Sequence, residues 1–295
     1  MSQATSPSAS KPYGLERVCR VWRIARSTVY DRRLQVARHE AGEVPRKRGP
    51  KRGVLSDAEL LEQIQAAIDS SPWVGEGYRK VHARLRFSGV RTSQRRTLRL
   101  MRENGLLAPS RVGQAHGPKA HDGTIVTEKP DDMWGTDATS ALTGEGNATI
   151  FFVVDHCTAE CLGIHAARRG TRFEALEPLR QAVRETRGDF AEDIATGTKL
   201  RHDHGSQFIS HAYQDEIRFL GIESSPSFVR EPEGNGCAER FVRTLKEQLL
   251  WIQRFDTVEE LLEALHEFKR QYNETWMIQR HGHQSPRARR RALAA

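Results

Sequence analysis

The second half of this 295-residue sequence alternates between strand-like and helix-like segments, and this alternation limits the fold more than any other feature. Three strand-like runs, at residues 133–142, 148–154 and 159–167, are joined by short polar or glycine-bearing connections, which predicts an antiparallel meander. Further strands are expected at 199–202 and 223–225, and helices at 172–186, 210–220, 236–251 and 257–272. This order predicts a mixed α/β layout around one central sheet.

Charge is divided unequally between the two halves of the chain. Residues 1–130 hold 25 Lys and Arg against 12 Asp and Glu, a net charge of +13, whereas residues 131–295 hold 21 against 26, a net charge of −5. A basic half of this kind is typical of nucleic-acid binding, and here it is joined to a half of different chemistry. The division excludes a uniformly basic coat protein.

Several classes of protein are excluded by simpler features. No apolar run approaches the length that spans a bilayer, so no membrane partner is expected, and residues 1–10 lack the apolar segment of a secretory signal. Four scattered cysteines do not make a disulfide scaffold, which favours a reducing cytoplasm. Near two of them, His156 and His165 suggest zinc, but packed thiols are favoured because no paired Cys-x-x-Cys knuckle is present. The cysteines are Cys19, Cys157, Cys161 and Cys237.

Residues 1–39 are interpreted as a disordered lead followed by two short helices that resemble a helix-turn-helix. Ser27 or Thr28 is expected to cap the second helix, since a side-chain oxygen there accepts a free backbone N–H. Arginines crowd around this unit, Arg26 among them. They favour DNA contact over a helical hairpin that only packs.

Residues 40–56 form a basic linker in which Pro and Gly deny regular structure. Its cations, including Lys47 and Arg48, are expected either to follow DNA phosphates or to be simply solvated. A second helical DNA-binding unit is predicted at 57–110, and a polar linker at 111–130.

The last helix of the second unit, at residues 94–104, follows a tight turn and ends at a glycine. It carries four arginines, which makes it a candidate recognition helix, with a solvated basic face as the alternative. These arginines are Arg95, Arg96, Arg99 and Arg102.

Three carboxylates stand out by their settings. Asp137 lies inside a strand, where a carboxylate is costly to bury unless it is paired or binds a metal. Asp203 ends a strand, and Glu239 opens a helix after 35 intervening residues. On that helix Arg243 and Lys246 follow Glu239 at i+4 and i+7, so the three share one face. The two cations are therefore expected to hold DNA phosphates beside the carboxylates, with ordinary surface charge as the alternative.

The spacing of these acids, with their flanks, resembles that of the retroviral-integrase and DDE-transposase superfamily. The flanks are Trp134-x-Thr136-Asp137, Asp203-x-Gly205-Ser206-Gln207-Phe208 and Pro232-x-x-Asn235-Gly236-x-x-Glu239. From about residue 11 to residue 290, the chain resembles a bacterial insertion-sequence transposase of the second-reading-frame (OrfB) type. The resemblance implies a ribonuclease-H-like mixed-sheet catalytic core over residues 131–290, preceded by small all-α helix-turn-helix-type DNA-binding units.

The resemblance also implies an activity, DNA strand cleavage and strand transfer in transposition, integration and recombination, by a DDE-type polynucleotidyl transferase. Two Mg²⁺ or Mn²⁺ ions per active site are expected, with Asp137 bridging them and Asp203 and Glu239 each completing one site. The expected partners are the terminal inverted repeats of the element, target DNA, further copies of the chain on DNA, and a first-reading-frame protein. The expected location is the bacterial cytoplasm, in association with the nucleoid.

One position departs from the family pattern. Family members often place a histidine two residues before the second aspartate, but here Arg201 occupies that position and His202 is adjacent to Asp203. Adjacent residues of a strand point to opposite faces, so no catalytic role is assigned to His202. Two alternatives stay open: a ribonuclease-H-like nuclease that cuts without joining, and a catalytically inactive DNA-binding regulator.

Overall fold

The structure of this protein is a computed structural model that describes residues 3–42, 55–109, 125, 127–227 and 235–294. The chain divides into two compact units, residues 1–54 and 55–295. The basic residues Lys47 and Arg48 lie outside the described residues, as does most of the linker predicted at 111–130.

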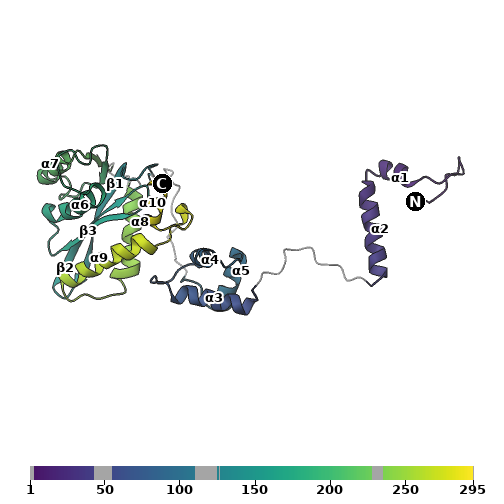
Figure 1. The fold of residues 1–295 in the computed structure, drawn as a ribbon, viewed down its shortest axis with the longest axis horizontal. Coiled ribbons are helices and arrows are strands. Elements are labelled where there is room, and N and C mark those ends of the chain that lie inside the picture. Colours follow the sequence, from purple (N-terminus) through teal and green to yellow (C-terminus); the bar gives the residue numbers. More distant parts are fainter. Residues whose placement is uncertain (1–2, 43–54, 110–124, 126, 228–234, 295) are drawn as a thin grey trace. The chain divides into compact units, whose positions relative to one another are not determined.

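The first unit contains two helices, α1 (Leu15–Val21) and α2 (Arg26–Glu40) (Figure 1). Cys19 of α1 is buried, whereas α2 buries no side chain. Helix α2 begins at Arg26, and its N-cap residue Ala25 makes no side-chain hydrogen bond. The expected cap by Ser27 or Thr28 is therefore wrong, because the helix already includes both residues.

The second unit opens with three helices, α3 (Asp57–Asp69), α4 (Tyr78–Phe87) and α5 (Gln94–Glu103). Ser56 starts α3 with a capping box: its side chain accepts from the Glu59 N–H, and the Glu59 carboxylate accepts from the Ser56 N–H. The three helices enclose a small apolar core of Leu60, Ile64, Val81, Leu85, Leu100 and Met101.

A five-stranded sheet follows, made of β1 (Met133–Thr143), β2 (Gly146–Asp155), β3 (Cys161–Ala167), β4 (Lys199–His202) and β5 (Glu223–Pro226). The strand order is β3-β2-β1-β4-β5. Strands β1, β2 and β3 pair antiparallel as a meander, whereas β4 runs parallel to both β1 and β5. The predicted mixed, ribonuclease-H-like sheet is therefore confirmed.

Helices cover both faces of this sheet (Figure 1). Phe151 and Val153 of β2 pack with α6 (Arg172–Arg187) and α7 (His211–Phe219). The alternate residues Ile150 and Phe152 pack on the opposite face with α8 (Gly236–Leu245) and α9 (Val258–Thr275). Because neighbouring strand residues face opposite sides, β1 directs Asp137 and the buried Ala141 to the α8 side.

The connection between α3 and α4 packs against the core of the second unit. Trp73 donates its indole N–H to Thr275 Oγ1 at 3.0 Å and meets the rings of Phe268 and Trp276 edge to face. The Val74 backbone exchanges two hydrogen bonds with the Gln248 side chain. Apolar burial and paired polar groups therefore join the helical region to the sheet region.

Two features of the C-terminal half differ from the sequence prediction. The helix expected at 236–251 is not continuous: α8 ends at Leu245, and a π-helical turn, η2 (Lys246–Leu250), continues it. After the short 3₁₀ helix η3 (Gln279–His281), a further helix, α10 (Pro286–Ala294), was not predicted. No helix in the described part of the chain is both long and apolar enough to cross a membrane.

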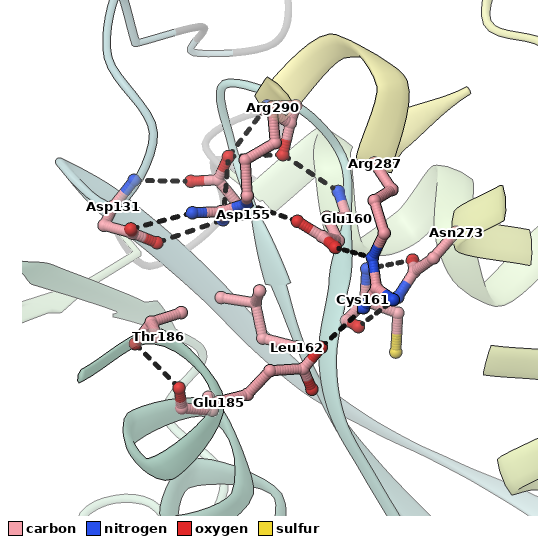
Figure 2. A network of polar contacts seen from close by, with 12 residues as sticks. Asp131, Asp155, Glu160, Cys161, Leu162, Glu185, Thr186, Asn273, Arg287 and Arg290 are labelled. Carbon is pink, nitrogen blue, oxygen red and sulfur yellow. Dashed lines mark hydrogen bonds and ion pairs between the residues drawn. The ribbon is translucent and has the colours of Figure 1, made fainter. Parts of the chain in front are cut away.

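Helix α10 is held to the sheet by a polar network (Figure 2). Arg290 bonds Asp131 at 2.8 Å and Glu160 at closer range, and lies 3.8 Å from Asp155. Arg287 bonds Glu160 at 3.1 Å. Asp155 and Glu160 lie at the β2–β3 turn and are almost fully buried, so the arginines neutralise carboxylates that water does not reach.

Candidate active site

Asp137 lies near the middle of β1, on the sheet face covered by α8. Its carboxylate accepts a hydrogen bond from the Ala138 N–H at 2.8 Å. Burial raises the pKa of Asp137 to about 6, and the negative charges of Asp203 and Glu239 raise it as well, whereas the Ala138 N–H and the positive charge of Lys246 act in the opposite direction. The charges of both other predicted acids and of one predicted cation therefore act on the Asp137 carboxylate.

Asp203 follows the last residue of β4, and its carboxylate accepts from the Gly205 N–H at 2.8 Å. In the parallel pairing of β1 with β4, Gly135 lies opposite Arg201. Asp203 lies two residues beyond this last pair. The exposed Asp203 therefore follows the strand next to β1, and its negative charge acts on Asp137.

Glu239 is exposed in the first turn of α8, and the start of this helix is fixed against β1. Asn235, its N-cap residue, donates from Nδ2 to the Thr136 carbonyl at 3.1 Å. The approach is so close that a Cβ on Gly135 would lie only 2.8 Å from Asn235 Oδ1 and 2.7 Å from His156 Nε2. A larger residue at this position, two residues before Asp137, would displace the side chains of Asn235 and His156.

Lys246 is the C-cap residue of α8 and the first residue of the π-helical turn, and it keeps a helical conformation, with φ −62° and ψ −49°. The helical backbone therefore continues from Glu239 through Arg243 to Lys246, as their predicted common helix face requires. Arg243 is exposed on α8, and Lys246 is partly buried. Of these two cations, the charge of Lys246 acts on Asp137.

His202, to which no catalytic role was assigned, is buried between strands. Its Nε2 contacts Ser224 Oγ of β5 at 2.9 Å, and its Nδ1 contacts the Asp203 carbonyl at 2.7 Å. Burial lowers the pKa of His202. Arg201, which stands where the family often has histidine, is also buried and donates to Ser225 Oγ and the Pro226 carbonyl. Both residues therefore contact β5.

The chemistry of the three acids fits a hard divalent cation, because Mg²⁺ prefers oxygen ligands. In the described chain no Lys, Arg or His forms an ion pair with Asp137, Asp203 or Glu239, so their negative charge is available to a cation. The three side chains do not form a compact ligand set, however: no group of three or more His, Cys, Asp or Glu among the described residues is close enough to hold a metal ion. Carboxylate movement would have to accompany metal binding.

The predicted DNA-binding arginines of α5 divide into two kinds. Arg96 and Arg99 bond the Asp57 carboxylate at 2.7 and 2.6 Å, and Arg99 also bonds Glu103. Arg95 and Arg102 are exposed, and no described residue pairs with them. In the first unit, Arg26 lies 4.0 Å from Glu16.

Sequence reasoning missed a second group of acids. Asp155 and Asp131, which carry no motif in the sequence, belong to the network that holds α10. Asp155 also accepts from the Thr158 backbone and hydroxyl and from the Asp131 N–H. The available signal was the cluster of arginines at 287–291, which the sequence places far from these acids. The four cysteines are all buried, in agreement with packed thiols.

Three family models match this chain. One, described as an HTH-like domain, matches residues 56–113, and two, each described as an integrase core domain, match residues 127–232 and 220–286. The matched ranges contain Asp137, Asp203 and Glu239. The helical region and the sheet region therefore correspond to different domain families.

Curated relatives from Escherichia coli align with most of the chain. The InsD transposase for insertion element IS2A/D/F/H/I/K is 28% identical over 238 residues, which covers 78% of this chain and 78% of the relative. The InsD transposase for IS2-9 of strain K12 is also 28% identical, with 78% and 76% covered.

Solved structures of lower similarity include the catalytic core domain of BIV integrase. It is 19% identical, with a TM-score of 0.39, and covers 53% of this chain and 91% of the integrase chain. A simian T-cell lymphotropic virus intasome, in complex with a PP2A regulatory subunit, is 16% identical, with a TM-score of 0.45 and coverages of 79% and 74%.

Proposed function

Because the chain belongs to the insertion-sequence transposases that carry an HTH-like domain and an integrase core domain, we propose that it cleaves and joins DNA strands at Asp137, Asp203 and Glu239. The observation that carries this assignment is electrostatic. A carboxylate inside β1 has its pKa raised to about 6 by burial and by the other two acids. Such a perturbed group, open to a cation, is a candidate catalytic group.

Asp137, Asp203 and Glu239 are the residues that would hold the divalent ions of an integrase-type core. When bound, Mg²⁺ or Mn²⁺ makes an attacking hydroxyl or water more acidic and stabilises the leaving oxygen of the phosphodiester. Asp137, whose pKa the negative charges of the other two acids raise, would be one of the residues that hold these ions. The Asn235 contact with β1 fixes the start of the helix that carries Glu239.

The cations of α8 are proposed to bind the substrate backbone. Lys246 lies near enough to act on Asp137, and Arg243 is exposed on the same helix. Ammonium and guanidinium groups hold phosphate oxygens by charge-assisted hydrogen bonds. These two side chains would keep the scissile phosphate beside the carboxylates.

The helical regions are proposed to bind the terminal inverted repeats of the element, while the core also engages target DNA. Exposed, unpaired arginines such as Arg95 and Arg102 are suited to phosphate contact. Cleavage and joining at two ends favours several copies of the chain on DNA, and a first-reading-frame protein is a further proposed partner. We place this activity in the bacterial cytoplasm, at the nucleoid.

The decisive experiment compares wild type with Asp203→Asn on DNA that carries the element ends. Wild type should cleave these ends with Mg²⁺ and insert a pre-cut end with a free 3′-hydroxyl into target DNA. The variant should bind the ends normally but lose cleavage and joining on the order of 10³-fold or more. Asp189→Asn, an exposed acid elsewhere in the core, is the matched control.

Two results would overturn the proposal. Joining by Asp203→Asn at the wild-type rate would remove the site assignment. Cleavage without insertion of the pre-cut end would assign the chain to nucleases that cut but do not join.

A further inference from the structure

An exposed apolar patch lies beyond the end of α8. Trp251 and Ile252, which follow the π-helical turn, are 70% and 58% exposed, and Leu142 at the end of β1 is 75% exposed. All three line one hollow of about 910 Å³. Burying such side chains is favourable, so a cluster exposed together indicates a binding surface.

The segment that follows Trp251 is bonded to the hairpin between β1 and β2. Phe255 is buried, pairs with Thr143 in a parallel bridge and accepts from the Gly144 N–H at 2.9 Å. The start of α9 is tied to the same hairpin, since the Val258 N–H donates to Glu145 at 3.0 Å. The contact is tight enough that a Cβ on Gly144 would meet the Asp256 carbonyl at 2.7 Å. These contacts therefore fix the chain a few residues after Trp251.

Two cations line the hollow, and the charge of one of them also acts on the candidate active site. Lys246 and Arg254 line it, and no described side chain forms an ion pair with either. Asp256 is the acidic residue among the described lining. The charge of Lys246 also acts on Asp137, so one side chain belongs to both places. The π-helical turn that begins at Lys246 is a rare geometry that occurs frequently at functional sites.

We propose that this patch binds DNA where its bases are unpaired, with Trp251 stacking on a base while Lys246 and Arg254 hold the adjoining phosphates. An exposed aromatic ring beside unpaired cations matches the base and backbone of a single strand. A second copy of the chain fits less well, because the centres of protein interfaces are depleted in lysine. The inference rests on the proposed function, since it gives the same DNA substrate a second contact beside the carboxylates.

The test measures binding of the full-length protein to two labelled probes in EDTA, where no cleavage occurs. One probe is a fully paired duplex, and the other is the same duplex with a short single-stranded 3′ extension. Trp251→Ala should weaken binding of the extended probe about tenfold while leaving duplex binding unchanged. Trp251→Phe should restore most of the loss, because phenylalanine keeps a stacking face.

Two further variants complete the design. Phe173→Ala removes another exposed aromatic ring, on α6, and should affect neither probe. Arg254→Ala should weaken both probes and reduce the salt dependence of binding, as expected for a lost phosphate contact.

The proposal is overturned if Trp251→Ala weakens both probes equally or weakens neither. It is also overturned if the variant binds DNA normally but has a lower oligomeric mass in sedimentation, which would assign the patch to a second copy of the chain. Because binding in EDTA needs no catalysis, these outcomes are independent of the Asp203→Asn experiment.

Discussion

Two sets of three carboxylates lie in or next to the elements of the sheet region, and they differ in how their charge is balanced. Asp131, Asp155 and Glu160 surround Arg290 of α10, which contacts all three. Asp137, Asp203 and Glu239 form no ion pair among the described residues, and Lys246 only moderates the charge on the first of them. The first set is neutralised by the chain itself, and the second is left to a cation from outside.

This difference separates the acids that hold α10 from the proposed catalytic acids more clearly than burial does. Asp155 and Glu160 are more deeply buried than Asp203 and Glu239, yet Arg290 lies close to both, although burial still raises the pKa of Asp155. A buried, paired acid fixes neighbouring elements to one another. An unpaired acid with a raised pKa destabilises the folded chain when it is ionised, and binding of a cation can offset this cost.

The paired set is tested most directly by removing its cation. Arg290→Ala leaves Asp155 and Glu160 buried without Arg290, so we expect the free energy of unfolding to fall by about 3–5 kcal/mol. Urea unfolding of the full chain measures this change. Arg291→Ala, which removes an exposed neighbour that lies 3.8 Å from Glu274, should have little effect.

Arg290→Lys covers the case in which the alanine variant does not fold. Lysine keeps the charge but loses the forked contact with Asp131, so its stability should fall between wild type and alanine. An unfolding midpoint equal to that of wild type in both variants would show that the network does not hold the fold.

In the unpaired set, removing a charged group should raise the free energy of unfolding instead of lowering it. The pKa of Asp137 is about 6 in the folded chain, against 3.8 for the unperturbed group, so its ionisation disfavours the folded state as pH rises from about 4 to 6. Asp137→Asn removes this cost. In EDTA above pH 6 the variant should be more stable than wild type by about 2–3 kcal/mol, and the advantage should vanish below pH 4.

Adding Mg²⁺ sharpens this prediction. The ion should stabilise wild type more than Asp137→Asn, because binding to the native state adds to its stability. Equal stability of the two proteins in EDTA across the whole pH range would contradict the uncompensated charge of Asp137.

The smallest effect is expected in α5, where paired and unpaired cations lie on one helix. Arg95→Ala or Arg102→Ala should lower the slope of log affinity against log salt by about 1 for each lost phosphate contact. Arg96→Ala should act mainly through its lost contacts with Asp57 and the Leu55 carbonyl. An unchanged slope in the first two variants would assign Arg95 and Arg102 to a solvated face.

Much of the fold was predictable because apolar periodicity and turn residues along the chain indicate strands and helices. The strand runs at 133–142 and 148–154 lie within β1 and β2, and the helix expected at 172–186 matches α6. Apolar periodicity and turn residues are short-range signals, and tertiary packing left them intact here. The break of the helix after Leu245 has no equally local signal, since Lys246–Leu250 is composed of good helix formers.

The helix α10 shows where local patterns fail. Its sequence is dominated by arginine and alanine, and it has no apolar stripe to announce a packed helix. Arg290 is partly buried and contacts Asp131, Asp155 and Glu160. In the sequence, Arg290 lies 130 positions after Glu160 and 159 positions after Asp131. Long-range charge pairing of this kind is invisible to any window along the chain.

By itself the sequence determined the order of strands and helices and marked Asp137, Asp203 and Glu239, because strand, turn and helix-start positions are local properties. Only the tertiary structure decided which acids lack cations. It paired Asp155 and Glu160 with α10, brought Asp203 to the strand beside Asp137, and left Trp251 exposed next to Lys246. The physical reason is that charge balance and exposure depend on neighbours in space, and sheet pairing and helix packing choose those neighbours.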